Sequence, residues 1–355
     1  MLRERLEWGK LATFVPNKKT PVYNWFYYKE GFARELVLEC IRMFGLQPGQ
    51  TVLDPFSGVG TTLLACKEKG IDSVGFDVLP ASVFASRVKT GKYNPDQLRE
   101  SIAWLFQERF KPTPMEFPER FKRFFSKPLR DDIAFFKARI DQLEPRPVRE
   151  FILLGFINTA MKASWVWKDG GVLKVRKHPV PPFRKFFQRV LKRMVKEWER
   201  FQGTGTVSVD FGDARKLRLG PDTIDGVITS PPYLNQIDYT KVYEIENWFV
   251  GQPRPAIRSY LGLGEESPLD TYLRDMEQVL RELFRVCRPG AGVGLVVGDA
   301  LVEGRPVEID LKLAELAQGI GFTPGDILVL NKRAALRART IKVGLLRESL
   351  IVLEK

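Results

Sequence analysis

Residues 51–62 read Thr-Val-Leu-Asp-Pro-Phe-Ser-Gly-Val-Gly-Thr-Thr, and a helical pattern follows them. An apolar run ending at Asp54, then a glycine-rich turn, then a helix is how an α/β fold places a ligand at the carboxyl end of its first strand. Gly58 and Gly60 let the backbone approach that ligand closely. The pattern is not the dinucleotide fingerprint, because Leu63 stands where the third glycine would fall.

A second segment, residues 225–233, reads Asp-Gly-Val-Ile-Thr-Ser-Pro-Pro-Tyr. It predicts a short buried strand over 227–229 that runs into a rigid polar loop. Pro231 and Pro232 fix φ and have no N–H, so the carbonyl groups of Ser230 and Pro231 are held outward as acceptors. Such a loop suits a ligand that donates hydrogen bonds, as the exocyclic amino group of a nucleobase does, and Tyr233 is placed to stack on the ring.

These two segments resemble motifs of one known family. Ser230 to Tyr233 are similar to the Asp/Asn/Ser-Pro-Pro-Tyr/Phe signature of S-adenosylmethionine-dependent amino-methyltransferases, which methylate N6 of adenine or N4 of cytosine in nucleic acids. Residues 54–62 resemble the Asp-Pro-Phe-x-Gly-x-Gly-Thr-Thr cofactor motif of the same family. In that family the serine form is associated mainly with N4 of cytosine.

The resemblance implies roles for the matching residues. It assigns the catalytic loop to Ser230, Pro231, Pro232 and Tyr233, and cofactor binding to Asp54, Pro55, Phe56, Gly58, Gly60, Thr61 and Thr62. Asp77, at the end of a predicted strand over 73–77, is expected to accept hydrogen bonds from the cofactor ribose. Asp213, in a Gly-Asp-Ala sequence, is expected to meet the cofactor adenine. Asn235, Asp238 and Tyr239 are candidates for contacts to the target base, with helix capping as the alternative for Asp238.

The same resemblance predicts the fold, an α/β class I methyltransferase with a Rossmann-like mixed seven-stranded sheet and a helical insertion. We expect an N-terminal helix and cofactor-binding half over 1–88, a basic helical insertion for nucleic-acid recognition over 89–203 and a catalytic half over 204–355. Within the insertion, periodicity predicts helices over 96–110, 127–143, 149–167 and 183–201, the third of them packed on the sheet as a core helix. Strands over 327–331 and 349–353 are expected to close the sheet as an antiparallel pair.

Composition adds expectations about partners. The net charge of +13, the pI of about 9.6 and the 12% of aromatic residues favour a nucleic acid as partner over a merely solvated basic surface. The charge is concentrated in the insertion, where Lys and Arg alternate with phenylalanines that we expect to be mostly buried. Three cysteines without paired spacing and the single His178 predict neither a disulfide nor a metal site. With no apolar run of signal or membrane length, a cytoplasmic location is expected, and the composition hints at a thermophilic source.

For the reaction, the resemblance predicts methyl transfer from S-adenosylmethionine to N4 of cytosine. No cysteine follows a proline, which argues against methylation at C5. The chain also resembles archaeal enzymes that modify cytosine in small-subunit ribosomal RNA, some by dimethylation, so RNA is the expected polymer. Methylation of DNA at cytosine N4 or adenine N6 is the alternative, and a non-catalytic nucleic-acid-binding protein is a third reading. Target site and oligomeric state stay open.

Overall fold

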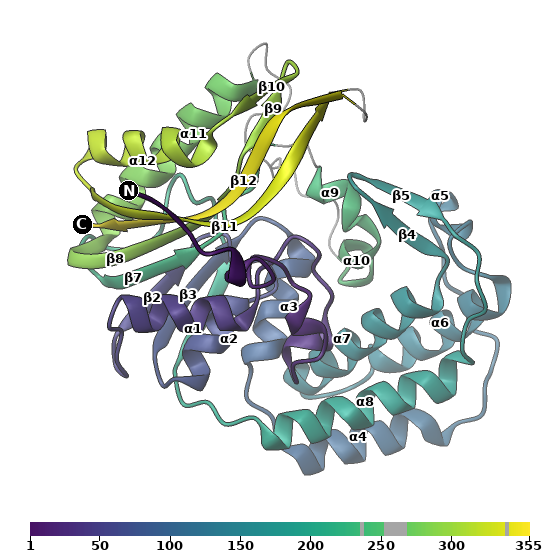
Figure 1. Cartoon of the computed structure of the whole chain (residues 1–355). Coiled ribbons are helices and arrows are strands. Elements are labelled where there is room, and N and C mark those ends of the chain that lie inside the picture. Colours follow the sequence, from purple (N-terminus) through teal and green to yellow (C-terminus); the bar gives the residue numbers. More distant parts are fainter. Residues whose placement is uncertain (235–237, 252–267, 338–340) are drawn as a thin grey trace.

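The predicted strands lie side by side in one sheet. The computed structural model describes residues 1–234, 238–251, 268–337 and 341–355, and within these ranges eight strands are hydrogen-bonded in the order β1-β11-β12-β8-β7-β2-β3-β6 (Figure 1). Their bounds are Leu2–Glu4 (β1), Thr51–Asp54 (β2), Asp72–Asp77 (β3), Val207–Phe211 (β6), Ile224–Thr229 (β7), Cys287–Gly298 (β8), Thr323–Arg337 (β11) and Ile341–Glu354 (β12).

The pairing of these strands defines the fold class. β12 is antiparallel to both of its neighbours, whereas every other pair in the sheet is parallel. In the expected class I methyltransferase topology, one strand runs antiparallel to an otherwise parallel sheet. β12 is that strand, which confirms the fold prediction. The eighth strand, β1, was not predicted; its three residues add to the edge of the sheet beside β11. A small hairpin of β9 (Ala300–Val302) and β10 (Arg305–Val307) forms a separate two-stranded sheet that packs against β12.

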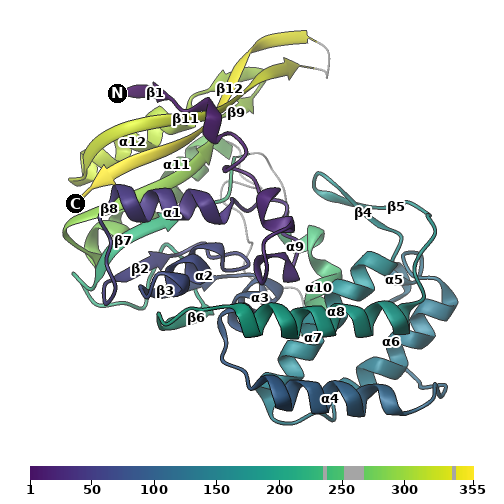
Figure 2. The same cartoon turned by 60° about the horizontal axis from the view of Figure 1, so that its bottom comes forward.

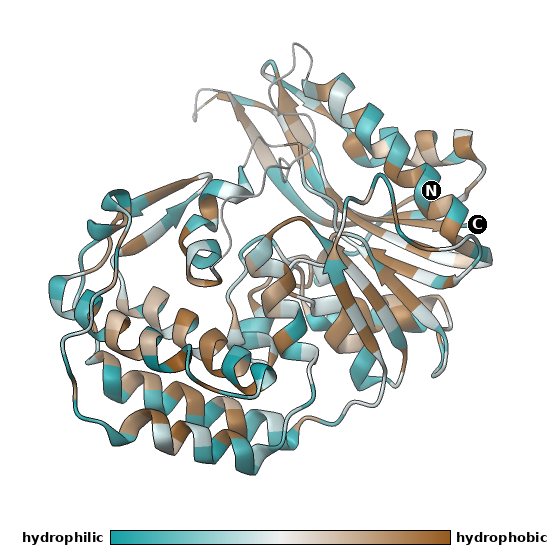
Figure 3. Cartoon of the chain, turned by 180° about the vertical axis from the view of Figure 1, so that it is seen from behind, coloured by the Kyte–Doolittle hydropathy of each residue, from teal (hydrophilic) through white to brown (hydrophobic). Residues whose placement is uncertain are grey.

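Helices cover both faces of the sheet. α1 (Arg34–Met43) and α2 (Thr61–Glu68) bury their apolar sides on one face, together with Ile228, Val296 and Leu350. α11 (Pro268–Val286) and α12 (Ile309–Ile320) bury theirs on the other face, against Val227 and Val293. Figure 2 shows the two helical layers with the sheet between them, and Figure 3 shows the central strands as largely apolar. None of the helices in the described ranges has the length and apolar character needed to cross a bilayer.

The insertion forms a helical subdomain beside the sheet (Figure 1). Its helices are α4 (Pro95–Gln107), α5 (Glu119–Lys122), α6 (Lys127–Ile140), α7 (Arg146–Ala163) and α8 (Phe183–Arg200), and it is joined to the sheet domain by α3 (Pro80–Thr90). The helix predicted over 149–167 ends earlier than expected, at Ala163. It packs mainly on α8, α6 and α3, so it is a core helix of the insertion and not a layer on the sheet.

After α7 the chain forms a hairpin that periodicity did not predict. β4 (Val166–Asp169) pairs antiparallel with β5 (Val172–Val175), and Gly170 at the turn has φ of +58°. The alternating sequence Val-Trp-Lys-Asp-Gly-Gly-Val-Leu-Lys-Val carries the hairpin signal, since an Asp-Gly or Gly-Gly pair supplies the positive φ that such turns need. The helical periodicity of the preceding residues extended the predicted helix to residue 167, into the first strand of the hairpin, and so hid this signal. Two further short helices, α9 (Tyr239–Val242) and α10 (Glu244–Phe249), lie between this hairpin and the sheet.

Buried phenylalanines hold the insertion together, as the sequence predicted. Phe136, Phe156, Phe183 and Phe187 are each at most 3% exposed. The rings of Phe136 and Phe187 meet edge to face with centroids 5.4 Å apart, and those of Phe156 and Phe187 with centroids 5.7 Å apart. Edge-to-face pairs add to the free energy gained by burying the rings. These four phenylalanines therefore belong to the core of the insertion, which leaves its Lys and Arg residues for outside contacts.

Replacing one of these rings tests the packing. We expect Phe187→Ala to lower the free energy of unfolding by about 3–5 kcal/mol, because truncation leaves a cavity among rings that cannot close over it. Phe110→Ala removes the same atoms from a side chain that is 47% exposed and contacts the Phe135 ring, and we expect a loss of only about 1 kcal/mol. Urea unfolding followed by circular dichroism measures both. Equal effects of the two substitutions would contradict the packing described.

Candidate active site

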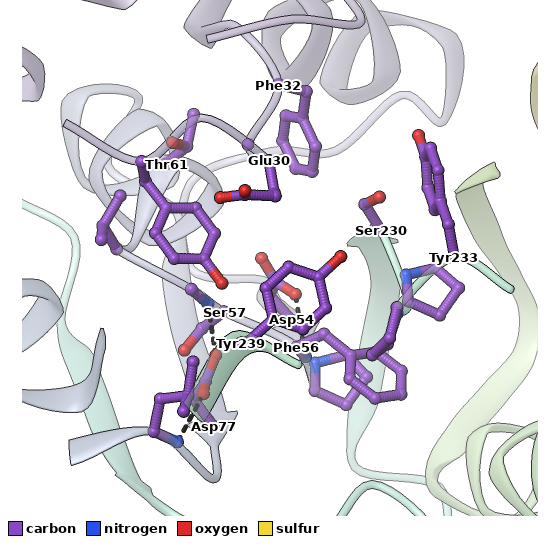
Figure 4. A pocket seen from close by; sticks show the side chains of 18 of the residues that line it. Glu30, Phe32, Asp54, Phe56, Ser57, Thr61, Asp77, Ser230, Tyr233 and Tyr239 are labelled. Atoms are coloured by element: carbon purple, nitrogen blue, oxygen red, sulfur yellow. Dashed lines mark hydrogen bonds between the residues drawn. The ribbon is translucent and has the colours of Figure 1, made fainter. Parts of the chain in front are cut away.

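A pocket of about 460 Å³ opens at the carboxyl ends of β2, β3 and β7 (Figure 4). These strands are adjacent and parallel, so their carboxyl ends reach the same edge of the sheet. β2 has β3 on one side and β7 on the other, and this change in direction of the strand order leaves a crevice at the strand ends. The pocket volume is in the range of small-molecule sites. The two sequence motifs therefore meet in one cavity.

The glycine loop after β2 is held by Asp77 from the end of β3. The Asp77 carboxylate accepts hydrogen bonds from the backbone N–H of Gly58 (2.8 Å) and of Leu79 (2.8 Å). Gly58 has φ of +48°, and a Cβ there would lie 3.3 Å from the Tyr28 ring. Burial raises the pKa of Asp77 to about 6, although these N–H groups favour the charged form. The Val78 N–H is a third backbone donor to this carboxylate, so about one of its roughly four acceptor sites remains for a ligand.

A buried hydrogen bond joins the two motifs. The Thr229 hydroxyl donates to Asp54 Oδ1 (2.6 Å), and the Phe56 N–H donates to the same oxygen (3.2 Å). Thr62, in the first turn of α2, donates through its hydroxyl to the Ile228 carbonyl (3.1 Å). Burial raises the pKa of Asp54 to about 7. The ends of β2 and β7 are thus tied at a fixed separation.

Two hydrogen bonds orient the catalytic loop, one to β8, which neighbours β7 in the sheet, and one to β12 beyond it. Ser230 Oγ donates to the Val296 carbonyl of β8 (2.9 Å). The Tyr233 hydroxyl donates to Glu348 Oε1 of β12 (2.9 Å), and its ring lies on Gly298, where a Cβ would approach it to 2.8 Å. Burial raises the pKa of Glu348 above its ordinary value. Stacking of Tyr233 on a target base stays a prediction.

The wall opposite the catalytic loop comes from the N-terminal segment. Tyr28 stacks on Tyr243 with ring centroids 4.9 Å apart, and the Tyr243 hydroxyl donates to Glu30 Oε2 (2.6 Å). Lys168 Nζ, from β4, lies 3.6 Å from the centroid of the Tyr243 ring and 2.6 Å from Glu246 Oε1. The insertion therefore packs directly behind this wall of the pocket.

Most of the residues singled out in the sequence line the pocket. They are Asp54, Pro55, Phe56, Gly58, Thr61, Asp77, Asp213, Ser230, Pro231, Pro232, Tyr233 and Tyr239. Gly60 and Thr62 lie behind it: Gly60 has φ of +75° and begins α2, with no room for a Cβ beside Ser86. These two residues shape the loop from behind and are not placed to touch a ligand.

The residues expected at the target base have different outcomes. Asn235 lies outside the described residues. Asp238 caps α9, accepting hydrogen bonds from the N–H groups of Thr240 (3.0 Å) and Lys241 (3.3 Å), which is the alternative noted from the sequence. It is not among the residues that line the pocket, whereas Tyr239 is.

Asp213 faces the pocket already engaged by a cation. Arg215 Nη2 lies 2.7 Å from Asp213 Oδ2, and the guanidinium also reaches Asp275 at 2.9 Å. Burial acts to raise the pKa of Asp213, but the hydrogen bonds and charge of Arg215 outweigh it and leave the pKa below the ordinary value. The carboxylate is thus charged and restrained at the edge of the site.

Sequence reasoning missed several polar residues of the pocket. They are Glu30, Arg215, Arg333 and Glu348. Glu30 lies two residues after the aromatic run 25–28, so a local signal existed. Arg333 and Glu348 lie about a hundred residues beyond the catalytic loop, and only the pairing of β12 with β8 brings them to the pocket.

Matches to known proteins agree with this geometry. Residues 9–83 match the N6_N4_Mtase family model, described as DNA methylase. The chain is 25% identical to the type II methyltransferase M.BsoBI of Geobacillus stearothermophilus, over 98% of this chain and 88% of that protein. It is 24% identical to M.AvaI of Nostoc sp., over 90% of this chain and 83% of that protein. The matches support an S-adenosylmethionine-dependent methyltransferase of the N4-cytosine/N6-adenine class.

A solved structure is also similar. An S-adenosylmethionine-dependent methyltransferase from Methanosarcina mazei aligns over 89% of this chain and 96% of its own, with 11% identity and a TM-score of 0.37. The fold class of the methyltransferase described here rests on its strand order.

The cofactor of this methyltransferase is S-adenosylmethionine, and the pocket fits it. The glycine loop brings backbone to the cavity at Gly58, Asp77 has acceptor capacity to spare, and the hydroxyl of Ser57 is buried without a hydrogen-bond partner among the described residues. In the described ranges no group of three His, Cys, Asp or Glu residues is placed to hold a metal ion. The glycine loop, Asp77 and the Asp54 carboxyl are the groups that would hold the cofactor.

Asp77 gives a test of cofactor binding. We expect Asp77→Asn to weaken S-adenosylmethionine binding by about tenfold or more, because the Gly58 and Leu79 N–H groups donate to different oxygens and an NH2 group would replace one of them. Wild-type affinity is expected to fall as the pH is lowered through about 6, where Asp77 becomes protonated. Isothermal titration calorimetry measures both effects.

The matched control is Asp72→Asn at the opposite end of the same strand. Asp72 accepts a hydrogen bond from the Thr206 N–H (2.7 Å) and does not line the pocket. Without cofactor, we expect pH to act on stability in the direction opposite to its effect on cofactor affinity. The folded state binds the Asp77 proton more tightly than the unfolded chain does. The free energy of unfolding therefore falls as pH rises from about 4 to about 6. Equal losses of affinity in both variants would contradict the role of Asp77.

Proposed function

We propose that the protein transfers a methyl group from S-adenosylmethionine to the exocyclic N4 of cytosine in a nucleic acid. The observation that carries the proposal is the orientation of Ser230. Its hydroxyl hydrogen is donated to the Val296 carbonyl, so the lone pairs of Oγ remain for a donor in the pocket. An exocyclic amino group is such a donor. Serine at this position, where an acid stands in other members of the resembled family, favours cytosine over adenine.

The residues act on the amino group mainly by position. S-adenosylmethionine supplies an activated methyl group, so the protein need not provide a strong base. The cytosine amino lone pair is delocalised into the ring. Hydrogen bonds from that amino group to Ser230 Oγ and to the Pro231 carbonyl draw the nitrogen toward tetrahedral geometry and direct its lone pair away from the loop. Pro232, lacking an N–H, presents no competing donor there.

Cysteine-dependent methylation at C5 finds no support in the site. Cys40, Cys66 and Cys287 are all buried, and none of them lines the pocket. Burial raises the pKa of the Cys40 and Cys287 thiols to about 12, which leaves them protonated and unreactive at neutral pH. This supports transfer to an amino nitrogen over transfer to carbon.

For the polymer, we propose DNA in place of the RNA expected from the sequence. The matching family model is described as DNA methylase, and the similar curated proteins are type II methyltransferases. RNA stays a second candidate because of one observation. The alignment with M.BsoBI runs over 451 positions, more than the 355 residues of this chain, so that relative has segments that this chain lacks. Segments of that kind are where a sequence-reading element for DNA would lie.

The reaction is tested with both polymers. The purified protein is incubated with radiolabelled S-adenosylmethionine and unmodified genomic DNA or total RNA, and the product nucleosides are separated. Label in N4-methyldeoxycytidine supports the proposal. Label in N4-methylcytidine or its dimethyl form would move the target to RNA, and label in N6-methyladenine would overturn the choice of base. Failure to bind the cofactor would favour a non-catalytic nucleic-acid-binding protein.

Ser230→Ala tests the catalytic loop. We expect kcat to fall on the order of 10²-fold, with S-adenosylmethionine affinity unchanged within about twofold, because the lost oxygen acts on the amino group during transfer. Ser73→Ala is the control, because it removes a hydroxyl that is buried, has no partner among the described residues and lies outside the pocket lining. A Ser230→Ala enzyme with wild-type kcat would contradict the assigned role.

A further inference from the structure

The strands β11 and β12 run beyond the sheet as a two-stranded ribbon, which we define as residues 331–337 and 341–347 (Figure 1). β8 pairs with β12 from Glu348 onward, and β1 pairs with β11 no further than Val329. Past these points, within the described residues, the two strands pair with each other from Lys332 opposite Arg347 to Arg337 opposite Ile341. The sequence predicted much shorter strands here, and neither motif required a projecting ribbon.

We propose that this ribbon docks the B-form DNA duplex that flanks the target base. The inference rests on the proposed function and adds the surface by which the polymer is held. It differs from the expectation that the helical insertion provides recognition.

The charge of the ribbon fits a polyanion. Residues 331–337 and 341–347 contain five Lys or Arg and no Asp or Glu. Lys332 pairs with Glu4, and Arg347 pairs with acidic residues beneath the ribbon. Arg333 and Lys342 are exposed. Positive side chains that project from a surface are the usual contacts to phosphates.

The ribbon begins at the catalytic pocket. Arg333 and Glu348 line that pocket, and Glu348 accepts the hydrogen bond from Tyr233 of the catalytic loop (2.9 Å). The base of the ribbon is also anchored from below, where Arg347 reaches Asp310 (2.8 Å). A strand of nucleic acid lying along the ribbon would therefore run past the mouth of the site that receives the base.

Shape and apolar exposure agree with the same partner. Leu336, Ile341 and Leu345 are 45%, 51% and 53% exposed, although they lie on paired strands. The major groove of B-form DNA admits a two-stranded ribbon, and apolar side chains there contact base methyl groups. The deep, narrow major groove of an RNA helix does not admit such a ribbon, so with RNA the same cations would contact phosphates of an unpaired strand.

The test compares two pairs of cations. Arg333→Gln with Lys342→Gln removes two positive charges from the ribbon. Arg189→Gln with Lys192→Gln removes the same two residue types from the exposed face of α8 in the insertion. Affinity for a fluorescent DNA duplex and for a single-stranded RNA containing cytosine is measured by anisotropy over a series of salt concentrations.

We expect the ribbon variant to bind about tenfold more weakly. The slope of log K against log salt should become shallower by about two, because two phosphate contacts are lost. The α8 variant should keep the wild-type slope. A larger effect on the duplex would support docking of B-form DNA, and a larger effect on the single-stranded RNA would overturn it. A ribbon variant with wild-type affinity and slope for both polymers would overturn the proposal.

A second copy of the chain is the other occupant that an exposed apolar ribbon can attract. Sedimentation velocity of the wild type and of Leu345→Ser distinguishes it: a dimer that Leu345→Ser dissociates, with nucleic-acid affinity unchanged, would overturn the docking role.

Methyl transfer by the wild type is measured on the same preparations. Absent transfer to any polymer would count against the proposed function, whereas normal transfer with unchanged binding by the ribbon variant would count against this inference alone.

Discussion

The buried hydrogen bond between the Thr229 hydroxyl and Asp54 Oδ1 connects the two halves of the site. One residue ends the strand before the catalytic loop, and the other ends the strand before the glycine loop. Because an unpartnered carboxyl at this depth would be costly, the bond keeps the two strand ends in one arrangement. The distance between cofactor and target amino group therefore depends on a contact that neither ligand makes itself.

Groups from remote parts of the chain then complete the pocket. Glu348 on β12 holds Tyr233 by its hydroxyl, and Val296 on β8 takes the hydrogen of Ser230. On the opposite wall, Glu30 is held by Tyr243, against which Lys168 of the insertion packs. The side chains that would meet a base are thus restrained by their neighbours before any ligand binds, which lowers the entropic cost of transfer.

The helical insertion has a more structural character than its composition suggested. Its phenylalanines form one core, and α7 lies inside that core against α8 and α6. Basic residues remain on the outside of these helices, as they do on the ribbon of β11 and β12. Net charge alone does not distinguish these two surfaces. Only their positions relative to the pocket do, because Arg333 of the ribbon lines the pocket itself.

The sequence by itself determined the strand ends and the loops that follow them, because glycine and proline constrain backbone angles locally. The fold class was predicted correctly, and most of the residues singled out in and around those loops line the pocket, including Asp54, Asp77 and Ser230. Only the tertiary structure decided that Asp238 caps a helix, that Gly60 and Thr62 lie behind the loop, and that Glu348 reaches the site. These outcomes depend on strand pairing and packing between segments distant in sequence, which no local pattern records.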